Sequence, residues 1–345
     1  MHSRNSAFSF NSPLIKSFLP AGNQQDVNQS DKIITYHYTS PEAFLSIVQD
    51  SAVRFTDIRY LNDKTEGIYF VKVLLDFMDK HLGKYPYFEL AVNTLLGEND
   101  FRKLRALETL EIRYSEIPQM PYKPGRAFVF CTSTEPDSLN MWNYYVNNGA
   151  YQGYSIGFKM DEFLRSFDTP NPNINDAFIV YYGKVLYTEK TQFEEINRIA
   201  EGLQKGITLN ASGSESAKNR GINYAALWLR NYIDSRGIFF KHPKFKSEEE
   251  YRIIIEINDE RIPRKEGDAD KYVGEHNKKM IEGFTTKRGL VVPYLKVSFT
   301  SESISRITIA PMIEYDIAKS SIKEVLSISQ MNKVKVFKST VPIRF

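Results

Sequence analysis

The chain has 345 residues, of which 42% are hydrophobic and 25% charged, a composition typical of a globular protein with a substantial core. Its 45 basic and 42 acidic residues give a net charge of +3. That balance argues against a protein that coats nucleic acid, although it still allows a nucleic acid in one local groove. The single cysteine, Cys131, excludes an intramolecular disulfide and a cysteine-based zinc cluster. The five histidines lack metal-ligand spacing, so we predict no metal.

Residues 1–31 are rich in Ser, Asn and Gln and predict a flexible N-terminal arm. They contain no apolar run long enough for a signal peptide, and no stretch of the chain approaches a membrane span. Together with the near-absence of cysteine, this predicts a cytoplasmic protein without a membrane partner. Predicted strands are spread over residues 32–345, which favours a single domain there.

The first predicted element is a short strand at 33–38. The segment Thr39-Ser40-Pro41-Glu42 then predicts a helix start, because it combines a hydroxyl cap, an early proline and an early acid. In chain order, the sequence next predicts a strand at 52–56, a turn at Asn62-Asp63, a helix at about 66–81, a charged helix at 99–116, a strand at 127–132, a helix at 138–147, and strands at 153–158 and 178–187.

The second half of the chain continues the same alternation. The sequence predicts helices over 189–235 broken by a loop at 211–221, a strand at 248–257, a polar loop at 258–286, strands at 289–299 and 304–310, a helix at 316–328 and a strand at 333–344. This mixture predicts an α+β fold with a mixed, mainly antiparallel sheet and a helical insertion at about 189–235.

No Walker loop, dinucleotide-binding glycine motif, nucleophile elbow or His-Glu-x-x-His helix is present, so chemistry has to come from three local clusters. The first is Tyr36-His37-Tyr38-Thr39. On a strand, His37 and Thr39 point to the same side and can hydrogen-bond ribose hydroxyls, while Tyr38 offers a stacking face. The plain structural alternative is a strand-end histidine bonded to backbone, followed by a hydroxyl that caps the helix.

The second cluster runs from Phe130-Cys131-Thr132-Ser133 to the segment 141–145. Trp142 and Tyr145 on one predicted helix can wall a pocket for a flat ring, or they can be core anchors. The third cluster is Lys246-Ser247-Glu248-Glu249-Glu250-Tyr251-Arg252. If it is a strand, Glu248 and Glu250 share one face. Two such carboxylates suit glycosyl chemistry, one on a ribose hydroxyl and one orienting the nucleophile, or they form a solvated strand start.

Taken together, these clusters resemble a bacterial family known as domain of unknown function 2971 (DUF2971). The resemblance runs from about residue 33 to 310. It is carried by Tyr36-His37-Tyr38-Thr39, Leu61-Asn62-Asp63 with Glu66, Phe130-Cys131, Met141-Trp142 with Tyr145, Gly153-Tyr154-Ser155-Ile156-Gly157-Phe158, and Glu248 with Glu250-Tyr251-Arg252. Lys246-Ser247-Glu248 departs from the family, which often has an aromatic residue ahead of the acids, and the segment 189–235 fits least well.

That family has no established activity, but a more distant likeness to ADP-ribosyltransferases implies one, together with a sheet of that superfamily's type. By position, His37 and Thr39 would hold NAD as a substrate, and Tyr38, Trp142 or Tyr145 would stack on it. Glu250 would be the catalytic acid with Glu248 as its partner, and the sequence does not decide which of the two dominates. Cleavage of the nicotinamide bond needs no metal, which agrees with a sequence that has one cysteine and no metal-ligand spacing among its histidines.

The resemblance therefore predicts an NAD-dependent ADP-ribosyltransferase, as a toxin or anti-phage effector that modifies nucleic acid or protein, or else an NAD glycohydrolase. A nucleotide or nucleic-acid sensor without turnover is the second hypothesis, with Arg54, Lys241, Lys244 and Lys246 as phosphate contacts. A metal-dependent nuclease is the third hypothesis, and it would use Asp63, Glu66, Glu248 and Glu250. The sequence predicts no oligomeric state.

Overall fold

The computed structural model of the protein describes residues 15–17, 33–61, 69–96, 126–146, 149–165, 178–210, 214–257, 280–287 and 289–343. Within these ranges it confirms the predicted α+β class with a mixed, mainly antiparallel sheet. The predicted helix at 99–116, the turn at Asn62-Asp63 and most of the predicted arm lie outside the described residues. The division into an arm, one domain and a helical insertion stays a prediction.

The described strands form one sheet of eleven strands around β4 (Arg126–Ser133) and β7 (Glu250–Ile257). β6 (Phe178–Lys184) and β1 (Ile15–Ser17) continue the sheet beyond β7. On the other side of β4 follow β2 (Ile34–Thr39), β5 (Tyr154–Lys159), β10 (Ile304–Ile309) and β11 (Lys335–Lys338). Among the described strands, β1 with β6 and β10 with β11 are parallel pairs, and the other pairs are antiparallel.

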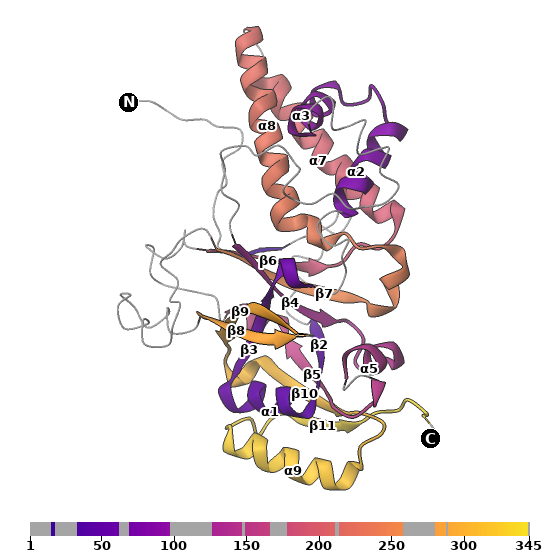
Figure 1. Cartoon of the computed structure of the whole chain (residues 1–345), viewed down its shortest axis with the longest axis vertical. Helices are drawn as coiled ribbons and strands as arrows, with labels where there is room; N and C mark the ends of the chain where they lie inside the picture. Colours follow the sequence, from indigo (N-terminus) through magenta and orange to yellow (C-terminus); the bar gives the residue numbers. More distant parts are fainter. Residues whose placement is uncertain are drawn as a thin grey trace, which may run out of the picture.

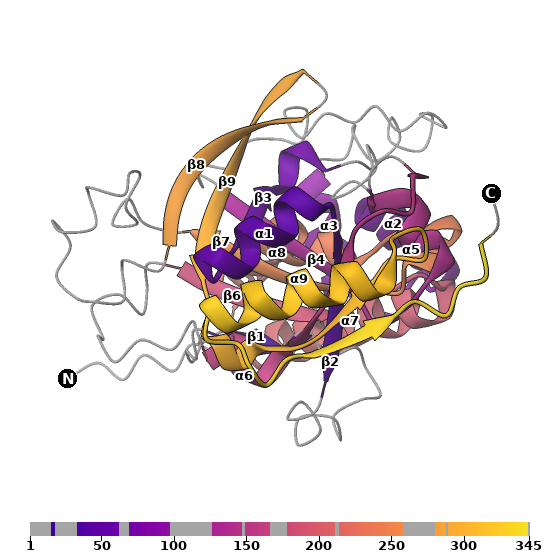
Figure 2. The same ribbon diagram turned by 90° about the horizontal axis from the view of Figure 1, so that it is seen from below.

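The sheet divides at one edge of β4. Near the end of β4, Ser133 pairs with Tyr36 of β2, and nearer its start, Val129 pairs with Thr56 of β3 (Ala52–Asp57). From β3 a second branch continues through β9 (Leu290–Ser298) to β8 (Met280–Lys287), which form the long hairpin at the side of the molecule in Figure 2. Residues 130–132 of β4 lie between the two contacts. We call this opening between β2 and β3 the fork.

Two groups of helices cover the sheet. α2 (Tyr69–Lys80), α3 (Pro86–Leu96), α7 (Glu189–Asn210) and α8 (Glu215–Arg236) pack together at the top of Figure 1, on a core that includes Val129, Tyr181 and Ile254. α1 (Pro41–Asp50) and α9 (Tyr315–Ile328) pack on a second core that includes Phe130 and Phe158. β7 lies between the two cores and is buried along its whole length, including its charged residues Glu250, Arg252 and Glu256.

Several local predictions are confirmed in detail. α1 begins at Pro41, and the Ser40 hydroxyl caps it by accepting from the Ala43 N–H at 3.3 Å. The helix predicted at 138–147 is α5 (Leu139–Tyr145). β5 and then the short helix α6 (Met160–Arg165) follow it in the chain. None of the helices that the structure describes has the length and apolar character needed to cross a membrane.

Other predictions are wrong at their boundaries. The loop predicted at 211–221 is too long, because Ser214 caps α8 by accepting from the Ala217 N–H and residues 215–221 are helical. The loop predicted at 258–286 is wrong at its end, where β8 starts at Met280 and pairs with β9. The strand predicted from residue 248 starts at Glu250. α3 and α6 were not predicted.

Candidate active site

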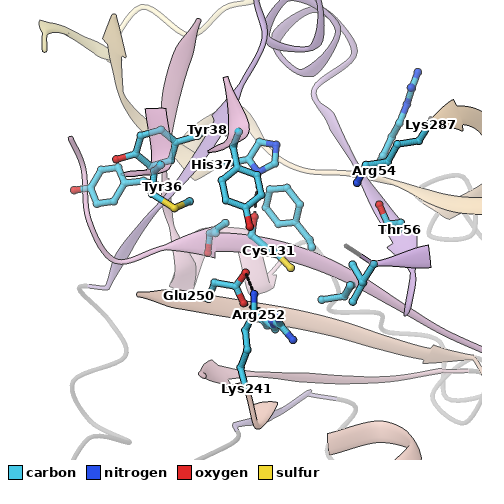
Figure 3. Close-up of a pocket in the computed structure, with 16 residues that line it drawn as sticks. Tyr36, His37, Tyr38, Arg54, Thr56, Cys131, Lys241, Glu250, Arg252 and Lys287 are labelled. Atoms are coloured by element: carbon cyan, nitrogen blue, oxygen red, sulfur yellow. Dashed lines mark hydrogen bonds and ion pairs between the residues drawn. The ribbon is translucent and has the colours of Figure 1, made fainter. Parts of the chain in front are cut away.

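A cavity of about 180 Å³ lies at the fork. The residues around it come from both branches of the sheet. Figure 3 labels Tyr36, His37 and Tyr38 of β2, Arg54 and Thr56 of β3, Cys131 of β4, Glu250 and Arg252 of β7, and Lys241 and Lys287. Met141 and Tyr145 of α5 also border the cavity. Pockets for whole drug-sized ligands have about 300–1,000 Å³. This cavity therefore suits one ring with part of a sugar, and a larger ligand has to extend beyond it.

Below the cavity lies a buried set of four charged residues, Lys241, Glu248, Glu250 and Arg252, which we call the ion network. Lys241, Glu250 and Arg252 border the cavity, whereas Glu248 does not border it and contacts Lys241. Each of the four residues is at most 5% exposed. The Lys241 ammonium donates to Oε2 of Glu248 at 2.7 Å and to Oε1 of Glu250 at 3.2 Å. The Arg252 guanidinium donates from Nε to Oε2 of Glu250 at 2.7 Å, and its Nη2 contacts the same oxygen. Two buried cations thus contact two buried acidic side chains.

The local backbone explains how the two acids meet. Glu248 ends a 3₁₀ helix, η7 (Pro243–Glu248), and is not part of a strand as the sequence predicted. Glu249 has a left-handed backbone with φ 42°, which turns the chain into β7 at Glu250. The acids therefore converge on Lys241 through this turn, and not through strand alternation. The Glu250 N–H is fixed by donating to the Tyr187 hydroxyl at 3.0 Å.

The two carboxylates titrate differently. Burial raises the pKa of Glu250, but the charges of Arg252 and Lys241 outweigh it, so the pKa is lowered and Glu250 stays ionised. Burial and the charge of Glu250 raise the pKa of Glu248 to about 7, against the opposing effect of Lys241. A carboxylate accepts about four hydrogen bonds, and Lys241 and Arg252 make three contacts with that of Glu250. The Glu248 carboxyl also hydrogen-bonds Glu250, so a group in the cavity has to share or replace one of these contacts.

The raised pKa of Glu248 predicts a pH dependence of stability. Between the ordinary pKa of 4.5 and about 7, the folded state binds a proton at Glu248 that the unfolded chain has lost. The stability that this bound proton gives the folded state is therefore fully present below pH 4.5, and it is lost as the pH rises through about 7. Relative to wild type, Glu248→Gln should gain stability from about pH 5 to about pH 8, by on the order of 1–3 kcal/mol. Urea unfolding at several pH values measures this, with Glu249→Gln, outside the ion network, as the control. A constant difference between Glu248→Gln and wild type would contradict the prediction.

His37 lies across the cavity from the ion network. Its Nδ1 is 3.1 Å from the Cys131 carbonyl oxygen, and its ring packs on Phe130 with 4.7 Å between ring centres. A carbonyl only accepts, so Nδ1 carries the proton and Nε2 is an acceptor in the neutral ring. Burial lowers the pKa of His37, against the effect of the Cys131 carbonyl, which keeps the ring neutral. Figure 3 shows His37 and Glu250 on opposite sides of Cys131.

Of the two aromatic candidates on α5, the structure places only Tyr145 at the cavity. Burial, together with the charges of Glu250 and Glu248, raises the pKa of Tyr145 and keeps it a neutral phenol. Trp142 is fully buried and donates from Nε1 to Asp137 at 2.7 Å, so it anchors α5 in the core.

The two neighbours of His37 on β2 also differ. Tyr38 borders the cavity, but its hydroxyl donates to the Glu135 carbonyl at 2.7 Å and accepts from the Ser138 N–H at 2.8 Å. That hydroxyl therefore holds the segment leading into α5. Thr39 is buried and is not among the residues around the cavity, so the structure brings His37 to the site without its predicted hydroxyl partner.

The open end of the cavity is basic. Arg54 is exposed on β3, and its guanidinium lies 4.7 Å from the centre of the Tyr294 ring. Gly283 makes room for that ring, because a Cβ there would lie 2.5 Å from Cζ of Tyr294. Lys287, also exposed, borders the same cavity. The cavity thus runs from the buried ion network to an exposed cationic rim.

Other sequence candidates lie elsewhere. Lys244 and Lys246 are exposed on η7 and do not border the cavity, whereas Lys241 is buried in the ion network. Asp63 and Glu66, which the nuclease hypothesis requires, lie outside the described residues. The described residues contain no group of three or more His, Cys, Asp or Glu side chains placed to hold a metal. The positive charge that lies between the acids Glu248 and Glu250 is the Lys241 ammonium, which donates a hydrogen bond to each of them.

Comparison with known proteins bears on one part of the chain. Residues 141–253 match the model of a family described as a protein of unknown function (DUF2971). The matched segment runs from α5 to β7 and includes Tyr145 and the whole ion network, so the predicted resemblance to this family is confirmed there. No curated protein and no solved structure matches the chain.

Proposed function

We propose that this protein transfers ADP-ribose from NAD to a macromolecular acceptor, and that the cavity at the fork holds the nicotinamide riboside end of NAD. One observation carries the proposal. A buried carboxylate with a lowered pKa, Glu250, lies across a cavity of ring size from a neutral histidine with an acceptor nitrogen. Such a pair can accept hydrogen bonds from two ribose hydroxyls, while the wall formed by Tyr145 contacts the ring.

The proposed reaction requires stabilisation of positive charge on the ribosyl group, which Glu250 can provide. The bond between ribose C1′ and the nicotinamide nitrogen breaks, and nicotinamide leaves as a neutral molecule with the bonding electrons. Positive charge develops on the ribosyl group, and the Glu250 carboxylate stabilises it in a site of low dielectric. An oxygen or nitrogen of the acceptor then bonds to C1′ and loses its proton to water.

The basic rim suits the rest of the substrate. NAD is larger than the cavity, so its diphosphate and adenosine must extend toward the open end. Arg54 and Lys287 lie at that end. Because Arg54 lies over the Tyr294 ring, its guanidinium can bind a phosphate with little further loss of side-chain freedom.

A nucleotide-binding module without turnover is the second candidate function. It is favoured by the two hydrogen bonds and the further ion-pair contact that Lys241 and Arg252 make with Glu250, since they leave the carboxylate little freedom to move. In that case NAD would stabilise the protein without releasing nicotinamide.

The test is to incubate the purified chain with NAD labelled in its adenylate part, with and without cell lysate and mixed nucleic acids. Free nicotinamide and labelled macromolecules are then measured. We expect both to appear. Nicotinamide without labelled product would indicate a glycohydrolase, and a rise in melting temperature without nicotinamide would indicate the binding module. Absence of nicotinamide release and of any melting shift would contradict the proposal.

A further inference from the structure

The branch of the sheet formed by β2, β5, β10 and β11 has two different faces. One face carries Ile156, Phe158, Ile307 and Ile309, which pack in the core beneath α1 and α9. The register determines which residues share the opposite face. Tyr36 pairs with Gly157, Gly157 with Arg306, and Arg306 with Lys335.

Residues from two neighbouring sets of strand pairs also lie on this opposite face. Lys159 of β5 pairs with Ile34, and Phe337 of β11 pairs with Thr308. We call Tyr36, Lys159, Arg306, Lys335 and Phe337 the cationic face. The four strands contain no Asp or Glu. Tyr36, at the inner edge of this face, is buried in a cluster with Met141 and Trp142, whereas Lys335 and Phe337 are exposed at its outer edge. Three cations without an acid in these strands favour an anionic ligand.

Arg306 is held at the centre of the cationic face between two aromatic rings. Its Cζ lies 4.0 Å from the ring centre of Phe337 and 5.8 Å from that of Tyr36. Gly157 provides the space, because a Cβ there would lie 2.6 Å from Cγ of Arg306 and 3.1 Å from Cε1 of Tyr36. Both stacking contacts fix the guanidinium before any ligand binds.

The hydrogen bonding of Arg306 is incomplete. Its Nε is buried and has no hydrogen-bond partner among the described residues. Its Nη2 reaches the Thr308 hydroxyl at 3.5 Å, which is long for a hydrogen bond. A buried guanidinium N–H without an acceptor is costly, and a phosphate oxygen is the acceptor that best fits a fixed guanidinium.

The cationic face adjoins the cavity at the fork. Tyr36 borders that cavity and also forms one side of the Arg306 stack. Phe337, at the far side of the stack, is 37% exposed, and Lys335 is exposed beside it. A chain of phosphates lying along this face would therefore lead to the cavity, with an exposed ring available for a base to stack on.

We propose that the cationic face binds a single-stranded polynucleotide through its phosphates, and that this strand is the acceptor in the reaction. The role as acceptor rests on the proposed function, whereas the binding does not. A single strand is favoured because its bases are free to stack on Phe337, while duplex DNA is usually read by an element that enters a groove. Three cations in adjacent strands also exceed what one phosphorylated side chain needs.

The test is fluorescence anisotropy with labelled single-stranded RNA and DNA of about 12 nucleotides, without NAD. A duplex and a phosphorylated peptide serve as competitors. Arg306→Lys keeps the charge but loses the planar guanidinium and its Nε, and should weaken binding about tenfold. Lys335→Ala should weaken binding about threefold to tenfold and reduce the slope of log affinity against log salt by about 0.7.

The matched control is Lys323→Ala, which removes one exposed cation from α9 on the other side of this branch and should leave the affinity unchanged. Melting temperatures show whether each variant is folded. Failure of wild type to bind either single strand would overturn the proposal, as would equal losses in Lys335→Ala and Lys323→Ala. Stronger binding of the duplex or the peptide would overturn it as well.

This binding experiment and the assay with labelled NAD together separate this inference from the proposed function. If single strands bind through the cationic face but NAD is never consumed, the transferase proposal fails and the binding surface remains. If label from NAD is transferred to proteins and no single strand binds, the transferase proposal stands and the cationic face is not its acceptor site.

Discussion

Replacing Glu250 by Gln is expected to slow nicotinamide release roughly a few hundred-fold, because the developing ribosyl charge loses about 3–4 kcal/mol of electrostatic stabilisation. The side chain keeps its size and one acceptor oxygen, so NAD binding should change much less than turnover. Single-turnover measurements of nicotinamide, together with calorimetric titration of NAD, separate the two effects. The expected pattern is a loss in rate at nearly constant affinity.

The matched control for this prediction is Glu249→Gln. It makes the same chemical change one residue earlier, at a side chain that does not border the cavity. Its turnover should equal that of wild type. Since Glu250 also pairs with Lys241 and Arg252, the variant must be assayed below its own melting temperature. Full turnover in a folded Glu250→Gln protein would remove this residue from the mechanism.

Replacing Arg252 by Met is expected to lower the free energy of unfolding by about 3–5 kcal/mol. Arg252 is 1% exposed, and its loss leaves the buried Glu250 with Lys241 as its remaining cation in the ion network. The Ile238 carbonyl also loses the hydrogen bond that it accepts from Nη1. Urea unfolding monitored by circular dichroism measures the change.

A double-mutant cycle shows whether the ion pair causes this loss. Glu250→Gln combined with Arg252→Met removes one charge of each sign, so the double variant should be more stable than the sum of the two single effects predicts. We expect a coupling of on the order of 1–3 kcal/mol. Strict additivity would mean that Arg252 stabilises the protein by packing and not through Glu250.

The fold class was predictable because the local patterns are strong. The β-prone run at 33–38 and the cap and proline at Ser40-Pro41 set β2 and α1 almost to the residue. α3 was missed although the sequence carried its signal: Pro86 begins it, and Phe88, Ala91, Val92 and Leu95 have the i, i+3, i+4, i+7 spacing of a helix face. The left-handed turn at Glu249 was missed because the run of three acids fits a strand equally well.

The site was predictable only in part. Arg252 lies two residues after Glu250 on β7, so strand alternation could have identified it as the partner of that acid. Lys241 had no such signal, because it reaches Glu248 and Glu250 around the 3₁₀ helix η7. Trp142 and Tyr145 lie on one short helix, and only tertiary packing decides that the first is core and the second borders the cavity.

The fork itself follows from no local pattern. It exists because β2 and β3 both pair with the same edge of β4 and then diverge. Those pairings join segments about 70 to 100 residues apart, whose register is set by the two cores and not by neighbouring sequence. The cavity, its cationic rim and the placement of His37 opposite Glu250 depend on this arrangement.

The most direct measurement is a calorimetric titration of NAD into wild type, His37→Phe and the control Lys323→Ala. Phenylalanine retains the packing on Phe130 but removes the acceptor nitrogen that we assign to the ribose. We predict that one NAD binds wild type and Lys323→Ala equally, and that His37→Phe weakens binding about tenfold, as expected for one lost hydrogen bond of about 1–1.5 kcal/mol. Equal binding to all three proteins, or to none, would contradict the placement of NAD at the fork.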